Sequence, residues 1–323
     1  MRKIGCTALV VGGLMLVALF VAIRSWAGPG PLADPVNVTI AEGATLTAAA
    51  QSLEEAGVIV SADRFVMFSR VLGGNAPVRA GEFEMPAYVS QAEALRILQE
   101  ATPVQRFVTV TPGMPAVIVH DRLMENEHLT GEVAVPEEGS ILADSYSYER
   151  GASRADIVAR MQGAMDEALV ELWPERRPNT AVSTPEEAVI LASIVEKETG
   201  VAEERRMVAG VYSNRLRQGM RLQADPTIIY PITQGRPLGR RIRRSEIDAV
   251  NEYNTYSMAG LPRGPIANVG REALEAVLNP AQTDALYFVA DGTGGHVFAE
   301  TLDEHNRNVE RWFAIRRQRG EME

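Results

Sequence analysis

The sequence predicts a mixed α+β protein that follows an amino-terminal transmembrane helix. Three observations lead to this prediction. The chain begins with a long uncharged stretch, strand and helix patterns then succeed one another up to about residue 110, and strong helix patterns follow after residue 153. The order of these elements also determines where a functional site can lie.

The composition is that of a globular protein and excludes some classes of function. Hydrophobic residues make up 46% of the 323 residues and charged residues 23%, which argues against disorder. The formal net charge of −10 lacks the basic excess typical of proteins that bind nucleic acid. Cys6 is the single cysteine of the sequence, so an intramolecular disulfide bond is excluded.

The uncharged stretch runs from Ile4 to Ile23. At about 1.5 Å per residue a helix of this length spans roughly 30 Å, which is the hydrocarbon thickness of a bilayer. A cleavable signal peptide usually has an apolar core of only about 7–15 residues. We therefore expect an uncleaved transmembrane helix, with cleavage near Trp26-Ala27-Gly28 as the alternative. Arg2 and Lys3 precede the stretch and place the amino terminus in the cytoplasm.

A small α+β unit is expected after a short linker that contains Gly28-Pro29-Gly30-Pro31. Alternating apolar residues and turn signals predict strand, helix, helix and strand over residues 36–40, 45–56, 62–71 and 81–85. Ser90 is expected to cap a further helix, and another strand is expected at residues 107–110. Residues 113–148 show no regular pattern.

Two helices and a hairpin are expected in the second half of the chain. Apolar residues at helical spacing predict a helix from Arg154 to Leu172. Thr184 has the features of a helix cap, with Pro185 at the first helical position and Glu187 completing a capping box. Residues 286–290 and 296–300 predict a β-hairpin, because glycines join them.

The end of the second helix carries the strongest candidate for chemistry. Positions three, four and seven apart share a helix face, so Glu198 continues the apolar stripe of Val195, Ile194 and Leu191. Burial favours the neutral form of a carboxyl group, and a protonated glutamate is the general acid that glycosidic bond cleavage requires. The alternative is that Glu196 and Glu198 only solvate the helix end. Asp225 is a candidate for a second carboxylate.

Four blocks of sequence carry a resemblance to a known family. They are Leu191-Ala-Ser-Ile-Val-Glu-Lys-Glu-Thr199, VAGVYSNRLRQGMRLQADPTIIY at 208–230, YNTYSMAGLPRGPI at 253–266, and LYFVADGTGGHVF at 286–298 followed by Thr301, His305 and Asn306. The chain resembles the endolytic murein transglycosylases of the MltG/YceG-like family. It departs from the family pattern at Thr111-Pro112-Gly113, which lacks an acid, and at Ala143 and Ser145.

The resemblance implies a domain order. Residues 1–3 form a cytoplasmic amino terminus, 4–23 the transmembrane anchor and 24–35 a linker. Residues 36–102 form a LysM-like module, 103–180 a connecting region, and 181–323 a catalytic domain of the lysozyme-like, YceG-like α+β type. No cofactor and no metal ion is implied.

The resemblance also implies a reaction. The family's catalytic glutamate falls on Glu198, which protonates the leaving oxygen of a β-1,4 bond between N-acetylmuramic acid and N-acetylglucosamine and then acts as a base on the muramyl 6-hydroxyl. Seven residues in the matching blocks are candidates for binding the sugar: Gln223, Asp225, Thr227, Tyr253, Asn254, Thr255 and Tyr256. Local turn or core hydrogen bonding is the alternative for each. His296 and His305 lack the spacing of metal ligands and are interpreted as structural.

The expected partners are peptidoglycan glycan strands and the inner membrane, and we expect no nucleic acid. Peptidoglycan synthases or division proteins are further candidates that no residue identifies. Five arginines lie in an expected loop that is either solvated or in contact with acidic groups: Arg236, Arg240, Arg241, Arg243 and Arg244. The rival functions are a non-catalytic wall-binding scaffold and a muramidase that uses water.

Overall fold

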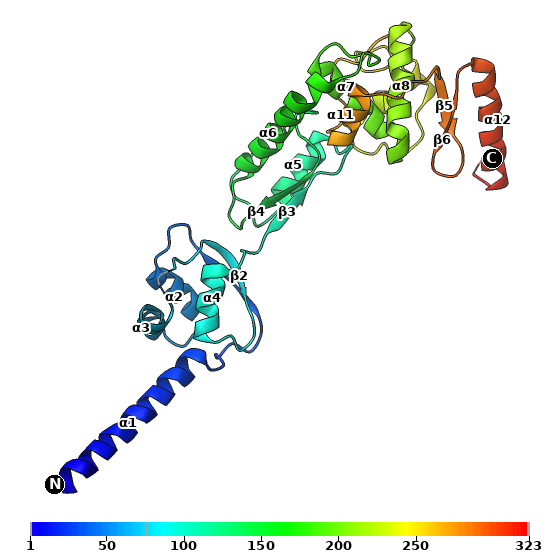
Figure 1. The fold of residues 1–323 in the computed structure, drawn as a ribbon. Helices are drawn as coiled ribbons and strands as arrows, with labels where there is room; N and C mark the ends of the chain where they lie inside the picture. The colour runs from blue at the N-terminus through cyan, green and yellow to red at the C-terminus, as the bar shows by residue number, and fades with distance from the viewer. Residues whose placement is uncertain (1, 75, 322–323) are drawn as a thin grey trace. The chain divides into compact units, whose positions relative to one another are not determined.

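The structure is a computed structural model that describes residues 2–74 and 76–321. The chain divides into two compact units, Met1–Arg106 and Phe107–Glu323. The second unit therefore contains both the predicted connecting region and the predicted catalytic domain. Both units mix helices with short antiparallel or paired strands, in agreement with the α+β class expected from the sequence (Figure 1).

In its described residues, the first unit contains a two-stranded sheet and four helices. Its elements are α1 (Arg2–Ala27), β1 (Val36–Ile40), α2 (Leu46–Glu55), α3 (Ala62–Leu72), β2 (Gly81–Met85) and α4 (Gln91–Glu100). Strands β1 and β2 pair antiparallel, with Val36 opposite Met85. The helices begin where the sequence predicts, because Thr45, Ser61 and Ser90 each accept a backbone N–H of the first turn.

Helix α1 extends beyond residue 23, and its carboxyl-terminal end packs against α3 and α4 of the same unit. The Trp26 ring lies 6.0 Å from the rings of Phe65 and Phe68, and the Gln91 amide donates a hydrogen bond to the Ser25 carbonyl. In the described part of the chain, no helix is both long and apolar enough to cross a membrane. Within the predicted segment 4–23, the structure does not describe the side chains of residues 4–12, which include Cys6, or those of residues 18 and 19.

The second unit is mainly helical. Its strands are β3 (Arg106–Thr109), β4 (Ser145–Tyr148), β5 (Tyr287–Ala290) and β6 (His296–Ala299). Its α-helices are α5 (Ala116–Glu125), α6 (Arg154–Leu172), α7 (Pro185–Glu198), α8 (Arg205–Arg217), α9 (Pro226–Thr233), α10 (Arg244–Ile247), α11 (Arg271–Leu278) and α12 (Leu302–Gln318), with 3-10 turns at Trp173–Glu175 and Ala202–Glu204. Strand β3 pairs with β4, and β5 pairs antiparallel with β6.

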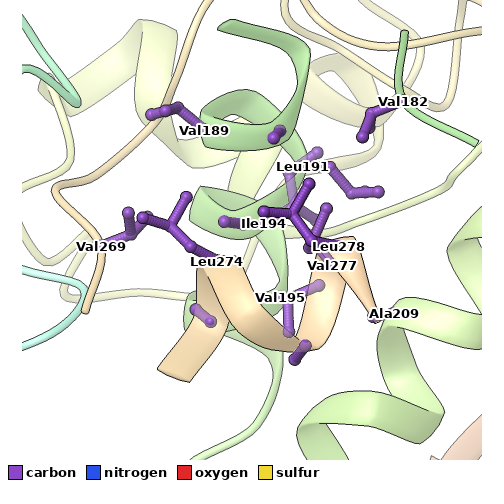
Figure 2. Packing of buried hydrophobic residues seen from close by; sticks show 14 of the residues in the cluster. Val182, Val189, Leu191, Ile194, Val195, Ala209, Val269, Leu274, Val277 and Leu278 are labelled. Atoms are coloured by element: carbon purple, nitrogen blue, oxygen red, sulfur yellow. The ribbon is translucent and has the colours of Figure 1, made fainter. Parts of the chain in front are cut away.

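Helix α7 is the centre of the main core of this unit. Leu191, Ile194 and Val195 are fully buried and lie against Leu274 and Leu278 of α11 (Figure 2). Burial on this scale stabilises each side chain by about 1.5–3 kcal/mol relative to exposure. The helix that carries Glu198 is therefore a rigid support, which suits a group that must keep its place during chemistry.

Six helices of the described residues were not expected from the sequence, namely α5, α8, α9, α10, α11 and α12. Helix α5 lies within residues 113–148, which show no regular pattern, and α9 begins directly after Asp225, where we predicted a turn. Pro115 precedes α5 without a side-chain cap, and the Glu138 carboxylate accepts the Ala116 N–H instead at 2.9 Å. A cap supplied from 22 residues away leaves no local signal.

Candidate active site

The start of α7 fixes the position of the helix. The Thr184 hydroxyl accepts the N–H of Glu187, and Pro185 occupies the first turn. The Glu187 carboxylate accepts the N–H of Ser183 at 2.6 Å, one residue before the position that a capping box predicts. The capping interactions therefore also hold Ser183, the residue that precedes the cap. The helix ends at Glu198.

Glu198 extends from the buried stripe of α7 as the helical spacing predicts. Its Oε1 atom is buried and has no hydrogen-bond partner among the described residues. Burial and, to a smaller extent, the charge of Asp225 raise the pKa of Glu198 to about 7, against the opposite effects of the Tyr212 hydroxyl and of Arg215. The carboxyl group therefore holds a proton over much of the range in which an ordinary glutamate is ionised.

Helix α8 places two side chains beside Glu198. Tyr212 is 1% exposed, and its ring meets that of Phe288 edge to face at 5.8 Å. The guanidinium of Arg215 donates to the carbonyls of Leu286 and Leu222 at 2.6 and 2.7 Å. Burial lowers the pKa of Arg215, yet a guanidinium stays charged at neutral pH. A positive group thus lies near the carboxyl group and is anchored by the backbone.

The loop after α8 supplies a carboxylate, and the loop after α10 supplies a phenol. The Tyr256 hydroxyl donates a hydrogen bond of 2.6 Å to Asp225. Burial raises the pKa of Tyr256, and so does Asp225, so the phenol remains protonated and can keep donating. Gln223 has a φ of 53°, which is uncommon for a residue other than glycine. Backbone in this conformation is often retained where it directs a functional loop.

These groups surround one cavity of about 600 Å³. It is lined by the polar residues Glu198, Tyr212, Arg215, Gln223, Asp225, Tyr256 and His305 and by the apolar residues Leu222, Phe288, Val289, Val309, Trp312 and Phe313. Convergent polar groups combined with apolar walls are typical of a ligand site.

The structure separates the seven predicted sugar-binding residues into two groups. Gln223, Asp225 and Tyr256 line the cavity with Glu198. Thr227 and Thr255 are fully buried, and their hydroxyls lie 2.9 Å apart. Their hydrogen bonds and those of the buried Asn254 hold the loops below the cavity together, as the alternative interpretation states.

Tyr253 lies elsewhere. Its ring packs 5.0 Å from that of Tyr230, and it is not among the residues that line the cavity. Glu196 also points away from the cavity residues. Its carboxylate accepts the Gly270 N–H at 3.2 Å and lies 3.7 Å from Arg205. The divergence of Glu196 and Glu198 follows from their spacing of two residues on a helix.

Sequence reasoning missed several residues of the cavity wall. Arg215 follows Tyr212 by three positions, so helical spacing within α8 could have indicated a shared face. His305 lines the cavity and stacks on Tyr287 at 5.2 Å, whereas His296 is held by Glu204 at 2.7 Å. Trp312 and Phe313 lie far along the chain from Glu198, and no local pattern connects them with it.

The groups around Glu198 are suited to general acid–base chemistry. A carboxyl group that remains protonated near neutral pH can donate its proton to a leaving oxygen. Arg215 then offers a positive charge to the carboxylate that forms. The cavity thus has the features of a general acid–base site that acts on a polar ligand, with one buried acid rather than a close pair of carboxyl groups on the same helix.

The YceG-like family model matches residues 38–311. The chain therefore belongs to the YceG-like family, and the membership that the four sequence blocks predict is confirmed. A protein of Bacillus subtilis (strain 168) named endolytic murein transglycosylase is 26% identical over 316 residues, which cover 88% of this chain and 86% of that protein.

Two further similarities agree with the family. A protein of the same name from Streptococcus pneumoniae is 35% identical over 178 residues, which cover 53% of this chain and 31% of that protein. The crystal structure of a YceG-like protein from Listeria monocytogenes has a TM-score of 0.52 and 24% identity, over 85% of this chain and 98% of that chain. This last similarity shows the fold alone and confirms the mixed α+β class.

Proposed function

We propose that this protein is an endolytic murein transglycosylase that cuts within peptidoglycan glycan strands. The single observation that carries the proposal is the buried carboxyl group of Glu198, whose pKa is raised to about 7 inside a cavity lined by polar groups. The names of the relatives from Bacillus subtilis and Streptococcus pneumoniae support the same activity.

The reaction uses one acid in two steps. Glu198 donates its proton to the oxygen that links N-acetylmuramic acid to N-acetylglucosamine, and the bond from that oxygen to the anomeric carbon breaks. The Glu198 carboxylate then takes the proton of the muramyl 6-hydroxyl, whose oxygen bonds to the same anomeric carbon. The product is a 1,6-anhydro-muramyl end, no water is consumed, and Glu198 is protonated again.

An internal nucleophile explains why one glutamate is enough. The attacking hydroxyl belongs to the sugar that is cut, so the step gains the advantage of an intramolecular reaction. Asp225 has a different role in this mechanism. Its charge raises the pKa of Glu198, and its hydrogen bond with Tyr256 occupies one of its oxygens. A hydrolytic muramidase would instead require Asp225 to activate water.

We further propose that residues 4–23 anchor the chain in the inner membrane, with the amino terminus in the cytoplasm and the residues that follow the anchor outside the cytoplasm. The support is the uncharged stretch of 20 residues in the sequence. Residues 36–102 act as a LysM-like module that binds the glycan, an assignment supported by their strand–helix–helix–strand order. Peptidoglycan synthases or division proteins are the further partners that such a location favours.

The test compares the full-length chain with Glu198→Gln on purified uncrosslinked glycan strands, with products identified by mass spectrometry. We expect internal cuts that end in 1,6-anhydro-muramic acid for the wild type, and a loss of at least about a hundredfold in rate for the variant. Glu196→Gln is the matched control, because Glu196 leaves the same helix on another face.

The other outcomes identify the rivals. Products heavier by one water would show a hydrolase and contradict the transglycosylase. Binding of strands without cleavage by the wild type would favour the scaffold. Equal loss of activity in Glu196→Gln and Glu198→Gln, with both proteins folded, would contradict the assignment of the acid to Glu198.

A further inference from the structure

One wall of the Glu198 cavity is aromatic and comes from the end of the chain. Val309, Trp312 and Phe313 of α12 line the cavity, together with Phe288 of β5. The family model matches residues 38–311, so Trp312 and Phe313 lie beyond the matched region. The mechanism proposed above uses none of these side chains.

The residues of this wall follow one face of α12. His305, Val309 and Trp312 all line the cavity, and their spacing of four and seven residues puts them on one face of α12. His305 stacks on Tyr287, and the Arg215 guanidinium lies 5.3 Å from the centroid of the Tyr287 ring. The face therefore begins beside Arg215 and continues along the helix for about 10 Å to Trp312. This length exceeds that of a single sugar ring.

The aromatic side chains are accessible in spite of their size. The structure describes all of α12, and none of its side chains is buried. Phe313 is 39% exposed, and the helix packs mainly against β5 and β6. Gly292 lies against the Trp312 ring, because a Cβ at this position would be 3.3 Å from it. The hairpin thus supports the indole, while the folding of the helix does not require the Phe313 ring.

We infer that Trp312 and Phe313 form a sugar-binding subsite that holds a pyranose ring of the glycan strand away from the bond that Glu198 cleaves. A pyranose ring presents C–H groups on its faces and hydroxyl groups at its rim, so an aromatic ring packs against the face. The inference rests on the proposed function, because the glycan strand is the ligand that the proposed function supplies. The aromatic wall is continuous with the cavity that the reacting sugar must enter.

The test measures cleavage of uncrosslinked strands sorted by length. Phe313→Ala and Trp312→Ala should each lower kcat/KM on long strands by about tenfold, with a smaller loss on the shortest strands that are cleaved. Trp312→Tyr should retain most of the activity, because it keeps an aromatic face. The products should keep their 1,6-anhydro ends, since Glu198 is untouched.

Leu302→Ala is the matched control on the same helix, because Leu302 is 54% exposed and does not line the cavity. Binding of long strands is measured in a Glu198→Gln background, where the strands stay intact. Weaker binding by the Trp312 and Phe313 variants supports the subsite even if the wild type proves to cleave by another reaction. Unchanged binding and unchanged kcat/KM on long strands, or an equal loss at every length, would overturn it.

Discussion

At the scale of the residue, the site depends on how neighbours act on one carboxyl group. Burial raises the pKa of Glu198, Asp225 raises it further, and Arg215 opposes both. The three residues come from α7, from the residue before α9, and from α8, respectively. The pKa of Glu198 therefore depends on charges that can be changed one at a time without replacing Glu198 itself.

Asp225→Asn should move the alkaline limb of the pH–activity profile to lower pH, by up to about one pH unit. The variant removes a negative charge that raises the pKa of Glu198, so the acid loses its proton at a lower pH. Activity at pH 6 should change little, while activity at pH 7.5 should fall. The measurement is kcat/KM on glycan strands between pH 5 and 9.

Asp248→Asn is the control for Asp225→Asn, because Asp248 is exposed and pairs with Arg244 on the surface. Its pH profile should match that of the wild type. An alkaline limb that stays in place in Asp225→Asn, or moves to higher pH, would contradict the electrostatic role of Asp225.

At the scale of the element, α7 combines a strong local start with a tertiary environment. Thr184, Pro185 and Glu187 determine where it begins, and the buried stripe determines which face turns inward. The same logic identifies the caps of α2, α3 and α4. Short-range signals of this kind are readable in a sequence because the groups that satisfy the first turn are close in the chain.

Thr184→Ala should lower the free energy of unfolding of the second unit by about 1 kcal/mol, because the N–H of Glu187 loses its acceptor. Ser153→Ala is a matched control. Ser153 precedes α6 in the same way, but its side chain makes no capping hydrogen bond, so the change should cost little. Chemical denaturation of both variants measures the difference, and equal losses would contradict the assignment of the cap.

The fold and the site were predictable from the sequence to different degrees. Helices α2, α3, α4, α6 and α7 and strands β1, β2, β3, β5 and β6 were expected near their observed bounds, and helical spacing predicted that Glu198 continues the buried stripe of α7. Helix α5 was not expected, because Glu138 caps it through a tertiary contact. Thr227 and Thr255 could not be distinguished from Gln223 and Tyr256, because only the folded chain shows which polar groups face a cavity and which satisfy one another below it.

At the scale of the whole molecule, each unit has a core of its own. Leu98 belongs to the core of the first unit and Leu191 to the main core of the second, and both are fully buried. A core that is complete within one unit supports cooperative unfolding of that unit by itself.

Leu98→Ala and Leu191→Ala should each destabilise one unit by about 2–5 kcal/mol. Calorimetry of the full chain should show that Leu98→Ala lowers the transition of the first unit and that Leu191→Ala lowers that of the second. Val170→Ala serves as control, because Val170 is 77% exposed. If either core variant shifted every transition by the same amount, the two units would not unfold independently.

The unpartnered carboxyl oxygen of Glu198 has a consequence for the catalytic cycle. In an unfolded chain this glutamate has a pKa near its ordinary value of about 4.3, whereas in the folded chain the value is about 7. Between these two pH values the folded chain with an ionised Glu198 is less stable than the folded chain with a protonated Glu198, and the difference grows as the pH falls below 7. In the proposed reaction the muramyl 6-hydroxyl returns the proton to Glu198, and burial favours this transfer because it disfavours the ionised carboxylate. The packing that buries the end of α7 thus also favours the return of a proton to Glu198 before the next cut.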